Sequence, residues 1–117
     1  MSENLKHYQI LIPVFTNAGE TYTDERHTWE MYLFDKIGGF TRGLKVFGAW
    51  RDPEADKAYW EEMIPYYVAV KDEDTFAEIT AEAFGIFADQ KTFFIAALGT
   101  ALIVERPRHS EFSKGDA

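Results

Sequence analysis

The spacing of hydrophobic residues along this chain divides it into six patterned segments. In four of them apolar and polar residues alternate or form a short apolar run, which predicts strands with at least one buried face. In the other two, apolar residues recur every three or four positions, which predicts amphipathic helices. The predicted strands are residues 8–15, 44–51, 63–71 and 92–105, and the predicted helices are residues 24–37 and 75–88.

The order of these segments, βαββαβ, predicts an α+β fold of the ferredoxin-like kind. Such a fold has a four-stranded antiparallel sheet with two helices on one face. The 117 residues are enough for one domain with one hydrophobic core. We expect that domain to span residues 1–105 and to be followed by a flexible polar tail at residues 106–117. Because this fold hosts many unrelated activities, it does not predict a function.

The expected helix boundaries follow from local signals. Thr23 is a suitable N-cap for the first helix, and Gly38 with Gly39 should end it. The acidic residues 72–74 should open the second helix, where negative charge favours the helix dipole. The expected buried stripes are Trp29, Leu33 and Ile37, widened by Met31 and Phe34, in the first helix and Phe76, Ile79, Ala83, Phe84 and Phe87 in the second.

The two faces of the predicted sheet differ in what should cover them. The last strand is apolar on both faces, so the face away from the helices also needs a cover. Two such sheets can pack face to face into a dimeric barrel, and we therefore expect a homodimer. We expect Ile10, Ile12, Tyr66 and Val68 to face the helices, and Gln9, Leu11 and Tyr67 to lie on the open face.

Composition narrows the function classes. Aromatic residues make up 16% of the chain, a surplus for a small domain that indicates self-association or a ligand pocket. The net charge of −8 repels phosphate backbones, so we expect no nucleic-acid partner. The absence of cysteine excludes disulfides and thiolate chemistry and suits a reducing cytoplasm. No signal peptide and no apolar run of membrane-spanning length is evident, so we expect a cytoplasmic protein without a membrane partner.

Motifs that carry catalysis are not evident in the sequence. His7, His27 and His109 do not share the spacing of metal ligands on one element. The pair Glu61-Glu62 opens the predicted third strand, where adjacent side chains point to opposite faces. Glycine-rich phosphate loops and nucleophile elbows do not occur. The sequence therefore predicts no metal, no cofactor and no catalytic residue, and it favours a binding protein over an enzyme.

Four short motifs carry a resemblance to a group of known proteins. They are Gly38-Gly39-Phe40-Thr41, Gly48-Ala49-Trp50-Arg51-Asp52, Tyr59-Trp60-Glu61-Glu62 and Gln90. Over about residues 8–105, this pattern resembles small uncharacterised ferredoxin-like proteins of bacteria, plasmids and phages. The resemblance implies the fold and no established activity. It singles out Thr41, Trp50, Asp52, Glu61 and Gln90 as candidates for a ligand or partner surface.

The same residues have a structural interpretation. Trp50 could belong to the core, while Thr41 and Gln90 could satisfy exposed backbone groups. The second and third predicted strands should form a hairpin with a long loop at residues 52–61. Such a hairpin would bring Glu61 beside Arg51 or Asp52.

Two hypotheses about function remain open. The first is a protein that acts by self-association or by binding another protein, with inhibition of a host protein as the variant that the phage and plasmid resemblance implies. The second is a small-ligand-binding dimeric barrel, or a cofactor-free oxidase or isomerase of that architecture. Its pocket would draw on His7, Gln9, Trp29, Trp50 and Tyr67.

Overall fold

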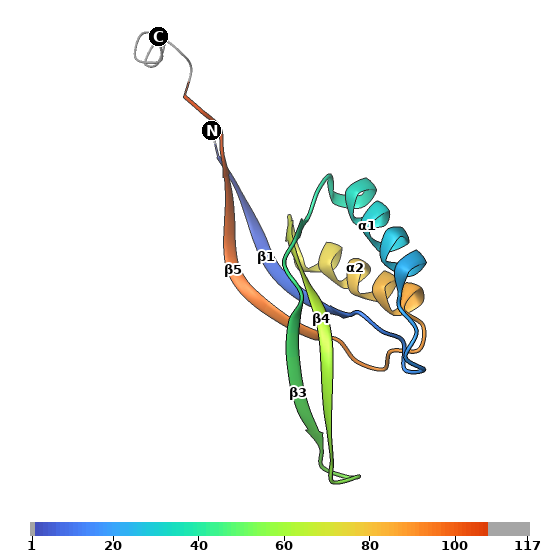
Figure 1. Ribbon diagram of the computed structural model, residues 1–117. Coiled ribbons are helices and arrows are strands. Elements are labelled where there is room, and N and C mark those ends of the chain that lie inside the picture. The colour runs from blue at the N-terminus through green and yellow to red at the C-terminus, as the bar shows by residue number, and fades with distance from the viewer. Residues whose placement is uncertain (1, 108–117) are drawn as a thin grey trace, which may run out of the picture.

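A computed structural model describes residues 2–107, which form two helices and five strands (Figure 1). In chain order the elements are β1 (Ser2–Pro13), α1 (Thr23–Ile37), β2 (Thr41–Arg42), β3 (Val46–Asp52), β4 (Lys57–Val70), α2 (Glu73–Ile86) and β5 (Phe94–Val104). From residue 108 onward, the tail predicted at 106–117 lies outside the described residues. Within the described range, neither helix is long and apolar enough to cross a membrane.

The sheet has the ferredoxin-like arrangement that the segment order predicts. β1 is central and pairs antiparallel with β4 on one side and with β5 on the other. β4 in turn pairs with β2 and β3 along its second edge. Both helices lie on the same face of this sheet (Figure 1), so its other face is left without a covering layer.

The sheet has one strand more than predicted, because Thr41–Arg42, which precede the second predicted strand at 44–51, pair with β4 as a short strand of their own. β2 pairs with β4 at Tyr66 and Tyr67, whereas β3 pairs with β4 only up to Met63. Between the two ladders lies Pro65, which has no N–H group to donate to a neighbour. The Gly43 N–H donates to the Pro65 carbonyl at 2.9 Å, and a Cβ at Gly43 would come within 2.8 Å of the proline ring. Glycine at this position therefore lets the chain pass the interruption.

The predicted long hairpin loop was also wrong. β3 and β4 stay paired as far as Asp52 and Lys57, so the loop contains only residues 53–56. The Asp52 carboxylate accepts hydrogen bonds from the backbone N–H groups of Glu54 and Ala55, at 3.0 and 3.4 Å. The Asp52 side chain thus provides acceptors for the backbone N–H groups of the turn. A short turn is therefore stable here, and the two strands continue far beyond the helices.

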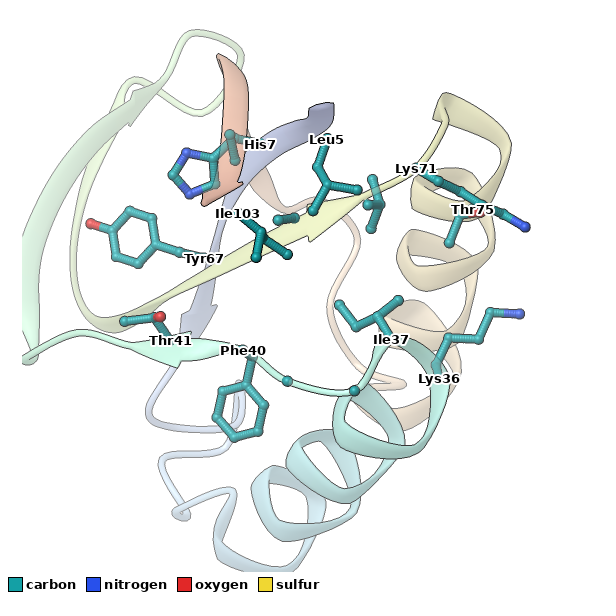
Figure 2. A pocket seen from close by; sticks show the side chains of 15 residues that line it. Leu5, His7, Lys36, Ile37, Phe40, Thr41, Tyr67, Lys71, Thr75 and Ile103 are labelled. Atoms are coloured by element: carbon teal, nitrogen blue, oxygen red, sulfur yellow. The ribbon is translucent and has the colours of Figure 1, made fainter. Parts of the chain in front are cut away.

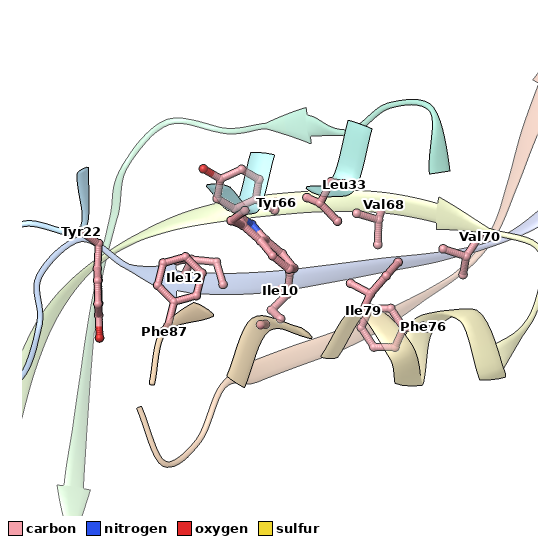
Figure 3. Packing of buried hydrophobic residues seen from close by; sticks show 12 residues of the cluster. Ile10, Ile12, Tyr22, Leu33, Tyr66, Val68, Val70, Phe76, Ile79 and Phe87 are labelled. Atoms are coloured by element: carbon pink, nitrogen blue, oxygen red, sulfur yellow. The ribbon is translucent and has the colours of Figure 1, made fainter. Parts of the chain in front are cut away.

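The hydrophobic core lies between the sheet and the helices, as Figure 3 shows. Ile10, Ile12, Tyr66 and Val68 are all buried on this side, which confirms the predicted alternation. The helices contribute their apolar stripes, although the outer members of these stripes stay exposed: Met31 by 48%, Phe34 by 58% and Phe84 by 38%. The remaining core members include Trp29, Leu33, Val70, Phe76, Ile79, Ala83 and Phe87.

The helix ends follow the sequence signals with one exception. Gly38 adopts a left-handed conformation at the end of α1, as expected for a glycine there. Asp72 accepts from the Thr75 N–H at 2.8 Å and so caps α2. Thr23, however, is the first residue of α1 rather than its N-cap. Tyr22 occupies the cap position because its ring packs in the core, edge-on to Phe87.

The molecule is much longer than a compact domain of its size. Its extents are 64 × 27 × 26 Å and its radius of gyration is 18.1 Å. A compact domain of this length has a radius of gyration of about 13 Å. Figure 1 shows why: the β3–β4 hairpin projects past the helices at one end, and the paired ends of β1 and β5 project at the other. We call the first extension, formed by paired residues 46–63, the hairpin arm. We call the second, formed by residues 2–6 paired with 100–104, the terminal arm.

Candidate functional site

The open face of the sheet carries a cluster of polar and aromatic side chains at its centre. Gln9 and Tyr67 lie opposite each other on β1 and β4, and the Gln9 amide donates to the Tyr67 hydroxyl at 3.1 Å. The His7 ring lies 6.1 Å from the Tyr67 ring, centre to centre. Thr41 of β2 pairs with Tyr67 from the other side. The structure therefore brings together four of the predicted candidates, His7, Gln9, Thr41 and Tyr67.

Next to this cluster is a groove of about 650 Å³. Its walls come from the open face near the terminal arm, from the α1–β2 connection and from the start of α2. Figure 2 shows the apolar side chains of Leu5, Ile37 and Ile103 between two polar ends. His7 and Tyr67 stand at one end, and Lys36 and Lys71 stand at the other.

A second, smaller groove of about 390 Å³ lies where the hairpin arm leaves the core. Glu61 and Gln90, two of the residues that the sequence resemblance singles out, both line it together with Trp60. Gln90 also holds neighbouring loops together, because its amide donates to the Tyr22 hydroxyl at 3.0 Å and to Asn17 Oδ1 at 3.4 Å. The interpretation that the Gln90 side chain satisfies exposed backbone groups was wrong, because its amide donates to two side chains.

The candidates on the hairpin arm do not form one site. Trp50 is half-exposed and stacks on Tyr59 with ring centres 4.7 Å apart, so the interpretation of Trp50 as a core residue was wrong. Arg51 pairs with Asp56 at 3.3 Å, and Glu61 lies opposite Gly48 instead of beside Arg51 or Asp52. The predicted contact of Glu61 with Arg51 or Asp52 fails because the turn is shorter than expected.

Trp29 belongs to neither groove. It is fully buried on the helix side of the sheet, edge-on to Tyr66. His7, Gln9 and Tyr67 lie on the opposite face, so one pocket cannot contain all the residues that the ligand-binding hypothesis grouped. The grouping was wrong because Trp29 belongs to a helix that packs on one face of the sheet. The sheet itself therefore separates Trp29 from His7, Gln9 and Tyr67 on the open face.

A charged cluster that the sequence did not predict lies beside the core. Glu30 of α1 accepts from the Tyr66 hydroxyl at 2.5 Å and from Arg42 of β2 at 2.7 Å. Burial of the Tyr66 ring, followed by its hydrogen bond to Glu30, raises the pKa of this phenol. The cluster ties α1 to β2 and β4. Glu30 and Tyr66 are 36 residues apart, so no local pattern indicates that they meet.

Comparison with known proteins identifies the class of fold. No protein-family model matches this chain, and no curated protein is similar to it in sequence. Two solved structures share its ferredoxin-like fold. The periplasmic divalent cation tolerance protein CutA from Archaeoglobus fulgidus superposes with a TM-score of 0.56 at 14% identity, over 96% of this chain and 91% of that one.

The second similar structure is a phage SAM lyase in complex with S-methyl-5'-thioadenosine. It superposes with a TM-score of 0.58 at 9% identity, over 90% of this chain and 93% of the lyase. At such identities the likeness concerns the path of the backbone and not the site. The α+β fold is therefore shared with both proteins, and function has to be argued from the surfaces of this chain.

Proposed function

We propose that this protein works as a homodimer whose open sheet faces and arms are covered by the second copy, and that it acts by binding rather than by catalysis. The observation that carries the proposal is exposed apolar surface on β5 and on the arms. Phe94 is 68% exposed on the open face, and Leu102 and Val104 are similarly exposed on the terminal arm. These side chains lie on both faces of β5, and several exposed apolar side chains along one strand favour an interaction site.

The amount of surface supports the same proposal. The accessible surface of the chain is 8242 Å². A compact protein of 13.5 kDa exposes roughly 6,500 Å². The excess, about 1,700 Å² for one chain, is larger than the roughly 800 Å² that each partner buries in a standard protein–protein interface. Two-stranded ribbons are also only marginally stable alone in water, so both arms gain from a partner.

The second copy is favoured over an unrelated partner by the sheet itself. β5 is a free edge of 11 residues without a charged side chain or a proline, which leaves its backbone groups unprotected against pairing. The open face beside it presents apolar side chains that can interdigitate with an equivalent face about 10 Å away. A net charge of −8 would at the same time limit open-ended aggregation.

The test is the mass of the assembly in native mass spectrometry and in light scattering after size exclusion. We expect a dimer for the wild type and a monomer for Phe94→Asp. Phe34→Asp is the matched control, because Phe34 is comparably exposed but lies on α1, away from the open face. A monomeric wild type would contradict the proposal and would direct the search to an unrelated protein partner, including the host protein of the inhibitor hypothesis. Equal effects of the two variants would also contradict it.

A second candidate function, small-ligand binding, is favoured by the 650 Å³ groove with its apolar centre and polar ends. Pockets that hold small molecules have this composition. Native mass spectrometry tests it in the same experiment, since a retained ligand adds mass to the protein. S-methyl-5'-thioadenosine, the ligand of the phage SAM lyase, belongs in the first panel of added compounds. The cytoplasmic location expected from the sequence stays a prediction.

A further inference from the structure

We infer that the 650 Å³ groove binds an amphipathic anion, a small molecule with an aliphatic or aromatic body and a carboxylate or phosphate end. This inference rests on the second candidate function and specifies its ligand class. Because the floor of the groove belongs to the open face, binding of this ligand is an alternative to complete cover of that face by a second copy. The charge of the lining favours an anion. The lining contains Lys36 and Lys71 and no aspartate or glutamate, although acidic residues outnumber lysines and arginines by 20 to 12 in the chain.

Two carboxylates beside these lysines have hydrogen-bond or ion-pair partners, and Asp72 also attracts Lys71. Glu78 of α2 forms an ion pair with Lys36 from outside the groove. Asp72, which follows Lys71 in the chain, accepts hydrogen bonds from both the N–H and the hydroxyl of Thr75. Lys71 is exposed, and its flexible side chain can turn towards an anion in the groove. It is therefore the residue that we assign to the charged end of the ligand.

The shape of the groove supplies the second argument. Leu5, Ala101 and Ile103 form its apolar floor on the open face, and Ile37 and Phe40 contribute from the α1–β2 connection. Figure 2 shows the Lys36 and Lys71 side chains on the helix side of Leu5 and Ile103 and directed away from them, so Lys71 has to turn inward for one molecule to contact both. At the far end, the Tyr67 hydroxyl and Thr41 offer hydrogen bonds. The groove thus matches a ligand with an apolar body and one anionic end.

Glycines 38 and 39 form part of the wall and keep it open. A Cβ at Gly39 would meet no atom within 4 Å, and its backbone does not adopt a positive φ. A larger side chain at Gly39 can therefore enter free space without straining the backbone. Gly39→Leu therefore adds bulk at the wall of the groove, and Gly39→Ala tests whether a substitution at this position affects folding.

The experiment is calorimetric titration of the full chain with three probes of equal chain length. They are octanoate, octyltrimethylammonium and octanol, each used below its critical micelle concentration or solubility limit. We expect octanoate to bind and the other two to bind at least about tenfold more weakly. We expect Lys71→Glu to weaken octanoate at least tenfold and Gly39→Leu to abolish its binding.

Lys91→Glu is the matched control, because it makes the same change of charge at an exposed lysine outside the groove. It should leave octanoate binding within about twofold of the wild type.

Equal binding of the cationic or neutral probe would overturn the assignment of an anion but leave small-ligand binding in place. If Lys71→Glu and Lys91→Glu weaken octanoate binding equally, the effect comes from the overall charge of the protein. That result would overturn the assignment of the groove as the binding site. If none of the probes binds, both the anion assignment and the groove as a ligand site fail. The mass of the assembly remains a separate test of the homodimer.

Discussion

At the scale of single residues, Tyr66 shows how one side chain links the core to a charged surface. Its ring is fully buried, while its hydroxyl donates to Glu30, which also holds Arg42. A hydrogen bond to a charged acceptor contributes more to stability than one between neutral groups. Tyr66 is therefore a position where the deletion of a single oxygen atom should lower the free energy of unfolding measurably.

We predict that Tyr66→Phe lowers the free energy of unfolding by about 1–2 kcal/mol in urea titrations at pH 7. The loss has two causes, the missing hydrogen bond and a partly buried Glu30 carboxylate with one partner fewer. Tyr67→Phe is the control, since the Tyr67 hydroxyl only accepts from Gln9 on the open face. It should cost less than about 0.5 kcal/mol. Equal losses in the two variants would contradict the role given to Glu30.

The same residue predicts a dependence on alkaline pH. The pKa of Tyr66 is raised in the folded protein by burial and by the hydrogen bond to Glu30, whereas an unfolded tyrosine titrates near 10. The folded state thus favours the neutral phenol. This contribution to stability is complete below about pH 10 and is lost as the pH rises towards the higher folded-state pKa. Between pH 9.5 and 11.5, unfolding free energy should fall more steeply in the wild type than in Tyr66→Phe; parallel curves would refute this.

At the scale of secondary-structure elements, β5 depends on a glycine at an irregular position. The ladder between β1 and β5 shifts register between His7 and Tyr8, and Leu98 is the extra residue on β5. Gly99, directly after it, has a φ of 104°, a conformation that other residues rarely adopt. This bulge lies where the terminal arm leaves the part of the sheet that the helices cover.

We predict that Gly99→Ala destabilises the protein by about 1 kcal/mol, because alanine is strained at this φ. The effect should be strongest in the terminal arm, where amide exchange of residues 100–104 should accelerate. Gly39→Ala serves as the control, since Gly39 has no positive φ and space for a Cβ. Unchanged amide exchange in Gly99→Ala would show that the bulge does not constrain the arm.

At the scale of the whole molecule, elongation and exposed apolar surface belong together. A chain with a radius of gyration of 18.1 Å keeps much of its sheet outside the single core. If a second copy covers that surface, folding and association are thermodynamically linked. The stability of the protein should then depend on its concentration.

We predict that the melting temperature rises by roughly 3 °C for each tenfold increase in protein concentration, as expected for a dimer of this size that dissociates on unfolding. Scanning calorimetry between 5 and 500 μM measures it. Phe94→Asp should remove the dependence, while Phe34→Asp should retain it. A melting temperature of the wild type that does not change with concentration would contradict the linkage.

The sequence by itself determined the order of the six long elements, the faces of β1 and β4, and most of the core. Local spacing is enough for these, because alternation places Ile10 and Ile12 on one face of β1 and Gln9 on the other whatever the rest of the chain does. His7, Gln9 and Tyr67 were grouped in the ligand hypothesis and Thr41 was singled out by the resemblance, and the structure brings these four candidates together on the open face.

Only the tertiary structure decided the length of the hairpin arm, the place of Trp29 and the groove between Lys71 and His7. The arm is long because the Asp52 side chain satisfies a four-residue turn, a contact that spacing alone does not reveal. Trp29 is separated from the open face by the sheet, and the groove forms from elements that are distant in the chain. Such features depend on which segments pack against each other, and that is decided by the burial of the whole core rather than by any local pattern.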